Sequence, residues 1–272
     1  MKPLYIYFLA ASLACTSCSD SWLDLNPSTS VPTDQAFSSL EDAQSALNGI
    51  YRLASAHSYY GDNFFYFGDC RAADVQARMT KGDGRRVSPY YEYNVKATDS
   101  FNSSLPWNQV YKVIRQTNNL IAATESGLIK TTDEAALNEI KAQALAMRGL
   151  ALYDLIRVFA MPYSYDNGQS LGVPIVTTAT DQSSKPARNT VAECYDQIIT
   201  DLTNSLAGLS KEKKDGCLNY WAVQGILSRV YLNKLDYPNA YKAATDVIEN
   251  SKSLYQLYTL DEYPTVWGKE YT

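Results

Sequence analysis

The chain has 272 residues and a net charge of −5, and 46% of its residues are hydrophobic. This length suits one large domain or two small ones with a sizeable buried core. The 24 Lys and Arg residues against 29 Asp and Glu residues indicate no basic surface for nucleic acid. A single histidine argues against a histidine metal centre or a Ser/His/Asp triad. The 22 tyrosines are an excess that suits a binding surface, because tyrosine joins an apolar face to a polar tip.

The N-terminus has the pattern of a secretory signal peptide. One cation at Lys2 precedes an uncharged, mostly apolar run at residues 4–14. The run is shorter than the roughly 20 apolar residues that cross a bilayer. Small residues and then Cys18 follow, which resembles the lipobox of bacterial lipoproteins. We therefore expect a signal peptide at residues 1–17 and a lipid attached to Cys18, with Cys15 as the other candidate and an ordinary cleaved signal as the alternative.

Three cysteines remain after the leader, namely Cys70, Cys194 and Cys217. An odd number excludes a complete disulfide framework, and no CxxC spacing indicates a redox or zinc motif. Cys194 lies in a helical run and is expected in the core, whereas Cys217 follows Gly216 in a loop. One bridge is compatible with the sequence, but free, buried thiols are favoured.

Helical periodicity fills most of the chain beyond the tether. Capping boxes at residues 39–42, 131–134 and 190–193 each open an apolar series with helical spacing. Gly208 is a plausible C-cap of the third helix. Little strand is expected, with small strands allowed around residues 173–177. The expected helices cover about 39–54, 107–127, 131–158, 190–206, 220–235 and 236–248.

The segment at residues 58–104 differs, because it has aromatic residues, glycines and charges without a long helical period. We expect an irregular stretch with room for one short helix. Long loops in compact domains are usually functional or mobile. Elsewhere, small and aromatic residues alternate between successive helices, notably around residues 227–240. This pattern favours degenerate tetratricopeptide-type pairs, in which a small residue on one helix admits an aromatic ring from the other.

Several segments resemble one family, the SusD/RagB-like lipoproteins of the Bacteroidetes outer membrane. The resemblance begins at the tether CSDSWLDLNP (18–27) and covers the chain to about residue 260. Each motif alone is weak, but their common order is specific. Gly149 departs from the usual Ala and Ala160 from the usual Gly. The other matching segments are WNQVYKVIRQTN (107–118), AQALAMRGLALYDLIRVF (142–159), GVPI (172–175), RNTVAECYDQII (188–199) and RVYL (229–232).

The resemblance implies a mostly α fold of tetratricopeptide-type helical pairs, anchored by lipid to the outer membrane and facing the cell exterior. It also implies a SusC-like TonB-dependent transporter as partner and an oligosaccharide or peptide as ligand. Family members are not enzymes, so no catalytic residue, metal or cofactor is expected. By the same resemblance we expect residues 18–30 to form a tether, and family members are about twice as long as this chain. Residues 31–272 are then the N-terminal helical region, with the C-terminal half of the fold missing.

Saccharide rings stack on aromatic faces beside hydrogen-bonding side chains, and residues 58–104 have that composition. We select Asp69, Arg71, Tyr90 and Tyr91 as candidate ligand-binding residues. The alternative is a structural role, in which these rings pack the segment onto the helices. At helical spacing, Tyr111, Tyr153, Tyr195 and Tyr231 are expected in the core. Arg148 is expected to pair with a carboxylate, and Asn118 to be a buried interhelical hydrogen-bonding residue.

The sequence gives little support for an enzyme. No carboxylate spacing marks a glycosidase pair. The glycine-rich residues 81–86 lack the spacing of a Walker phosphate-binding loop. His57 is expected at the surface. Two functions remain, a glycan-binding lipoprotein of an uptake complex and a tetratricopeptide-type scaffold that binds only protein. Exposed rings with nearby Asp and Arg in residues 58–104 would favour the first, and fully buried rings the second.

Overall fold

Short polar sequences set where several helices begin. The computed structural model describes residues 37–72, 88–94, 106–178, 184–251 and 254–266. The predicted capping boxes form at Ser39 with Asp42 and at Thr190 with Glu193. The box predicted at residues 131–134 does not form, because the Asp133 side chain accepts from the Ala136 N–H and caps the helix itself. The predicted signal peptide, the tether and Cys18 lie outside the described residues.

The described residues form helices and no named strand, apart from isolated bridges such as Leu171 with Thr190, so the strands allowed around residues 173–177 are absent. None of these helices is long and apolar enough to cross a membrane. The helices are α2 (Leu40–Ala54), η2 (His57–Gly61), α3 (Asn63–Arg71), α4 (Ser88–Tyr91), α5 (Trp107–Glu125), α6 (Glu134–Phe159), η5 (Tyr163–Tyr165), α7 (Val191–Leu206), α8 (Tyr220–Asn233), α9 (Tyr237–Asn250) and α10 (Tyr263–Val266).

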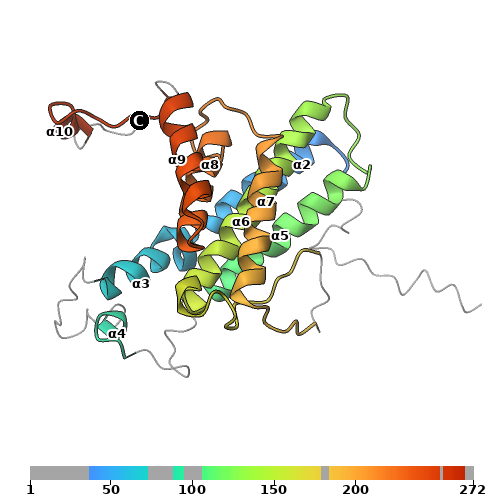
Figure 1. Ribbon diagram of the computed structural model, residues 1–272. Coiled ribbons are helices and arrows are strands. Elements are labelled where there is room, and N and C mark those ends of the chain that lie inside the picture. Colours follow the sequence, from blue (N-terminus) through green and yellow to red (C-terminus); the bar gives the residue numbers. More distant parts are fainter. Residues whose placement is uncertain (1–36, 73–87, 95–105, 179–183, 252–253, 267–272) are drawn as a thin grey trace, which may run out of the picture.

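Helix α6 is the centre of the bundle. It packs between α5 and α7, while α2 packs on α5 and α8 pairs with α9 (Figure 1). Unlike the amphipathic outer helices, α6 is buried on nearly every side from Ala142 to Ile156, which is typical of a core helix. The successive antiparallel pairs confirm the predicted mostly α, tetratricopeptide-like architecture.

Small residues let the helices approach closely. A Cβ atom added to Gly208 would lie 2.9 Å from the Ala142 Cβ atom and 2.9 Å from the Asn138 carbonyl oxygen. The C-cap of α7 is Ala207, so Gly208 serves this close approach rather than the predicted cap.

The four tyrosines predicted in the core differ in burial. Tyr153 and Tyr195 are buried, whereas Tyr111 and Tyr231 are half-buried against the core.

The three described cysteines are free thiols, as the sequence favours. Cys70 and Cys194 are buried and Cys217 is half-buried. Burial raises the pKa of the Cys194 thiol, which donates a hydrogen bond to the Val173 carbonyl. These thiols therefore pack as small apolar groups.

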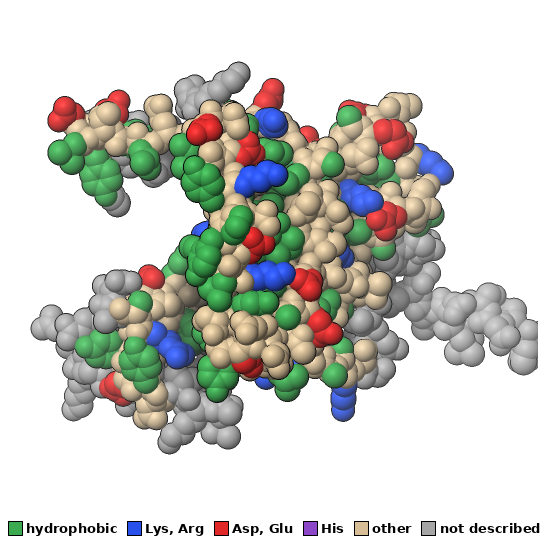
Figure 2. All heavy atoms as spheres, in the orientation of Figure 1, with side chains coloured by type: hydrophobic (Ala, Val, Ile, Leu, Met, Phe, Trp, Pro, Cys, Tyr) green, Lys and Arg blue, Asp and Glu red, His purple; other side chains and the backbone are tan. Residues whose placement is uncertain are grey.

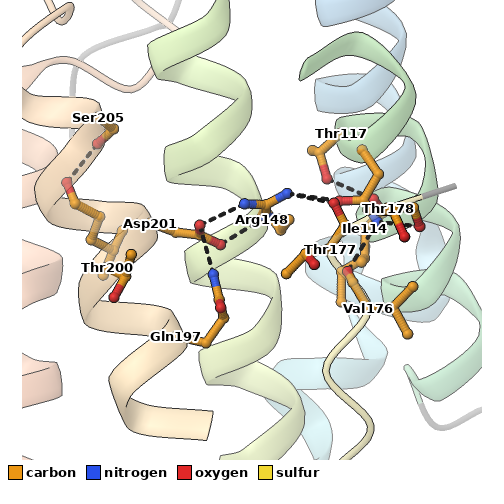
Figure 3. Close-up of polar contacts among 12 residues, drawn as sticks. Ile114, Thr117, Arg148, Val176, Thr177, Thr178, Gln197, Thr200, Asp201 and Ser205 are labelled. Carbon is orange, nitrogen blue, oxygen red and sulfur yellow. Dashed lines mark hydrogen bonds and ion pairs between the residues drawn. The ribbon is translucent and has the colours of Figure 1, made fainter. Parts of the chain in front are cut away.

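A buried ion pair joins α6 to α7 (Figure 3). The Arg148 guanidinium donates to both carboxylate oxygens of Asp201, at 2.8 Å from Nε and 2.6 Å from the terminal nitrogen. It also donates to Asn118 Oδ1 on α5 at 2.9 Å and to the Thr177 carbonyl at 3.1 Å. The predicted structural roles of Arg148 and Asn118 are confirmed.

The same network fixes the segment between α6 and α7. Asn118 Nδ2 donates to the carbonyls of Val176 at 2.9 Å and Thr178 at 3.2 Å, and the Tyr111 hydroxyl donates to the Pro174 carbonyl at 2.8 Å. Side chains of the bundle thus satisfy four carbonyls of this segment, those of Pro174, Val176, Thr177 and Thr178, and hold it against the helices without a named strand.

Arg148→Met is expected to lower the free energy of unfolding by about 3–5 kcal/mol, because it leaves the Asp201 carboxylate buried without its cation. The double variant Arg148→Met/Asp201→Leu removes both charges and should recover most of that loss. Urea unfolding followed by circular dichroism measures both variants. A double variant as unstable as Arg148→Met alone would contradict a role of charge pairing at this position.

Candidate ligand-binding surface

The aromatic stretch of the sequence forms an arm beside the bundle. The arm comprises η2, α3 and α4, and Figure 1 shows α3 and α4 extending away from the main helices. The expectation of one short helix in residues 58–104 is therefore wrong in its extent, because three helical segments form among the residues described there. Helix α3 fully buries only Asn63 and Cys70, so no apolar stripe marked it as a helix.

A buried carboxylate attaches the arm to the bundle. Asp154 of α6 has a fully buried side chain, and its Oδ2 accepts hydrogen bonds from the hydroxyls of Tyr59, at 2.6 Å, and of Tyr60. Its Oδ1 pairs with Arg157 at 2.5 Å. The rings of Tyr59 and Tyr60 stack with centroids 4.2 Å apart. Three donors thereby compensate the burial of this carboxylate.

Burial and the neighbouring carboxylate change the titration of the anchoring tyrosines. Burial raises the pKa of Tyr59 well above its ordinary value, and the charge of Asp154 raises it further. Burial likewise raises the pKa of Tyr60, and Asp154 adds to the shift. Both hydroxyls stay protonated at neutral pH and remain donors to Asp154.

The four predicted ligand-binding residues differ in their exposure on the arm. Asp69 and Arg71, near the end of α3, are exposed, and Tyr91 is half-buried. Tyr90 is only 3% exposed, with its ring edge-on to Phe67 at a centroid distance of 5.5 Å. Tyr90 therefore has the structural packing role that was the alternative to ligand binding. The binding role of all four residues stays a prediction.

Three exposed aromatic residues of the arm were not among those selected, namely Phe65 at 49%, Tyr66 at 38% and Tyr93 at 67% exposure. Phe65, Tyr66 and Asp69 share one face of α3, a relation that a helical assignment would have revealed. Figure 2 shows hydrophobic and charged side chains together on the outer end of the arm.

Arg71 organises the exposed end of the arm. Its guanidinium lies 4.8 Å from the Phe67 ring centroid and 5.5 Å from that of Tyr93, and the Tyr93 hydroxyl donates to the Arg71 carbonyl. Tyr93 adopts a positive φ of 54°, which turns the chain back toward α3. Neither Asp69 nor Arg71 has an ion-pair partner within the described part of the chain. Among the described residues of the arm, exposed aromatic side chains thus lie next to charged groups that form no ion pair there, an arrangement that suits a hydroxyl-rich ligand.

A groove of about 800 Å³ lies between α5, α6 and α7, apart from the arm. Its described lining includes Asn138, Lys141 and Asn204 but no aromatic residue. Lys141 is already paired with Glu125 at 2.7 Å. Without a ring for stacking, this groove is a weaker candidate for saccharides than the arm.

Comparison with known proteins places this architecture in a family. Residues 21–232 match a SusD-like family described as "Starch-binding associating with outer membrane". This chain belongs to the SusD-like family. A SusD-like protein of Bacteroides ovatus is 26% identical over 262 residues, which is 92% of this chain and 45% of that protein. SusD-like protein P2 of Formosa agariphila is 30% identical over 256 residues, covering 92% of this chain and 47% of the relative.

Solved structures agree with the SusD-like assignment. A SusD superfamily protein from Bacteroides thetaiotaomicron has a TM-score of 0.81 and 63% identity, over 86% of this chain and 51% of that chain. A SusD superfamily protein from Bacteroides vulgatus has a TM-score of 0.79 and 31% identity, over 85% and 52% of the two chains. The sequence thus spans about half the length of the SusD-like relatives it matches.

Alkaline pH is expected to destabilise the protein. The unfolded tyrosines ionise near 10.0, whereas the raised folded pKa values keep Tyr59 and Tyr60 protonated. Their contribution to stability is therefore complete below pH 10 and is lost as the pH rises further, by roughly 1.4 kcal/mol per pH unit for each. Urea unfolding between pH 9 and 11 measures the slope.

Tyr59→Phe removes one of these groups and should reduce that slope, while lowering stability at neutral pH because Asp154 loses a donor. Tyr241→Phe, at a tyrosine that is 74% exposed outside the arm, is the matched control and should leave the slope unchanged. An unchanged slope in Tyr59→Phe would contradict the proposed pKa shift.

Proposed function

We propose that this chain is the N-terminal part of a cell-surface lipoprotein that captures oligosaccharides or peptides and delivers them to a SusC-like TonB-dependent transporter. The observation that carries the proposal is membership of a family described as starch-binding and associated with the outer membrane, across residues 21–232. Because the relatives are about twice as long, their second half is proposed to complete the binding groove.

The arm supports saccharides as the ligand class. Sugar rings present apolar C–H faces to aromatic rings and hydroxyls to charged or amide groups. Tyr93 and Tyr66 expose ring surface next to Arg71 and Asp69, so one short segment offers both kinds of contact. These groups bind and orient a ligand but provide no general acid and base for its cleavage, so we propose binding without catalysis.

A protein-only scaffold is the second candidate. The burial of Tyr59 and Tyr90 favours it, because these rings attach the arm rather than face a ligand. The exposure of Phe65, Tyr66 and Tyr93 favours saccharide capture. Calorimetric screening against saccharides and peptides separates the two candidates. Retained association with the transporter without binding of either ligand class would select the scaffold.

Tyr93→Ala and Arg71→Ala are each expected to weaken saccharide binding about tenfold or more, since each removes a face or cation from the exposed end of the arm. A glycan array first identifies the best oligosaccharide for the full chain, and isothermal titration calorimetry then measures its Kd for each variant.

Tyr237→Ala is the matched control, because Tyr237 on α9 is 59% exposed yet lies outside the arm. Its Kd should equal that of the unmodified chain. Equal affinities for Tyr93→Ala, Arg71→Ala and the unmodified chain would exclude the arm as the ligand-binding surface.

We also propose a lipid anchor at Cys18. Cys18→Ser is expected to abolish incorporation of a clickable palmitate analogue and to release the protein from the outer-membrane fraction, because the acceptor thiol is gone. Cys15→Ser should keep both properties. The reverse result would move the attachment to Cys15, and an unmodified chain that incorporates no palmitate analogue would favour an ordinary cleaved signal.

A further inference from the structure

A separate pocket of about 440 Å³ lies where α6 and α8 end, next to η5. We call it the foot pocket and define it by Arg157, Met161, Tyr163, Ser164, Leu232 and Asn233, which are among its lining residues. None of these residues belongs to the arm, and sequence patterns singled out none of them as a ligand contact. Its volume falls within the usual range of small-molecule sites, roughly 300–1,000 Å³.

The wall of the foot pocket exposes large apolar side chains. Met161 is 46% exposed and Leu232 is 52% exposed, and the Tyr163 ring stands edge-on to Tyr195 with centroids 5.5 Å apart. Exposed aliphatic side chains gathered around a concave surface are uncommon unless something covers them. Together with the tyrosine rings they offer apolar surface to one face of a ligand.

Polar groups converge on the same space. The hydroxyls of Tyr163 and Ser164 form no hydrogen bond within the described part of the chain. The Asn233 amide donates from Nδ2 to the Tyr153 hydroxyl at 2.5 Å, which orients the side chain and leaves Oδ1 as an acceptor. A purely apolar ligand would leave these groups buried without partners, so the lining favours a ligand that has hydroxyls.

The pocket has no uncompensated charge. Arg157 is the one charged side chain among its described lining residues, and the buried Asp154 carboxylate balances it at 2.5 Å. An anionic ligand would lose its hydration without gaining an unpaired cation, which is costly. The charge balance therefore favours neutral sugars over acidic ones.

Arg157 connects the foot pocket to the arm. Its guanidinium lies 5.2 Å from the Phe64 ring centroid of α3 and 4.8 Å from the Tyr153 ring centroid. The pocket therefore begins beside the point where the arm joins the bundle.

We propose that the foot pocket is a subsite for a neutral hexose unit of an oligosaccharide. The inference rests on the proposed saccharide-binding function and extends it to a site outside the arm. Tyr163 and Leu232 contact the apolar ring face, and Ser164 and Asn233 hydrogen-bond the hydroxyls. Arg157 is a positioning residue that forms one wall while it holds Asp154.

Methyl-¹³C methionine NMR of the full chain tests the proposal. Met161 lines the pocket, whereas Met147 is only 3% exposed in the core and serves as the internal control. The probes are maltotriose, laminaritriose, cellotriose and, as a charged probe, trigalacturonate. At least one neutral trisaccharide should shift the Met161 signal, assigned with Met161→Leu, while Met147 and the trigalacturonate titration stay unchanged.

One variant at the pocket and one control variant sharpen the test. Leu232→Glu should weaken the response of Met161 to the neutral trisaccharide about tenfold or more, and Leu257→Glu, at a 96% exposed residue elsewhere, should not. A Met161 signal that no neutral probe moves overturns the foot pocket. If calorimetry then still detects saccharide binding that Tyr93→Ala abolishes, the proposed function stands alone. Absence of all binding overturns both.

Discussion

The fold depends on pairing the charges that its central helix carries into the core. Helix α6 is buried on nearly every side, yet it contains Arg148 and Asp154. Unpaired charges in such surroundings would cost several kcal/mol each. Arg148 is compensated by Asp201 from α7 and by Asn118 from α5, and Asp154 by Arg157 and by the hydroxyls that precede α3.

The networks that neutralise Arg148 and Asp154 position different parts of the molecule. Around Arg148 the partners are Asn118 of α5 and Asp201 of α7, and Arg148 and Asn118 also donate to the carbonyls of residues 176–178, so this network fixes the bundle. Around Asp154 the partners are Tyr59 and Tyr60, so this network fixes the arm. The proposed ligand-binding surface is therefore attached to the most buried helix of the fold, which limits the disorder that a ligand would have to overcome.

The sequence predicts the architecture well, because most helices of the bundle have an apolar stripe or a cap. It also predicts that Arg148 must be paired, since a cation in the middle of an apolar helix has no other stable state. The partner Asp201 lies 53 residues away and only the fold identifies it. Helix α3 lacks a stripe, and the contrast between Tyr90 and Tyr93 depends on long-range contacts with Phe67 and Arg71.

Hydrogen exchange measured by mass spectrometry, with and without the oligosaccharide that binds best, tests the central claim most directly. The account predicts slower exchange on ligand binding in peptides covering α3 and residues 88–94, with no change in the core of α6. Protection confined to α8 and α9, or protection nowhere in the chain despite measurable binding, would contradict the arm as the ligand-binding surface.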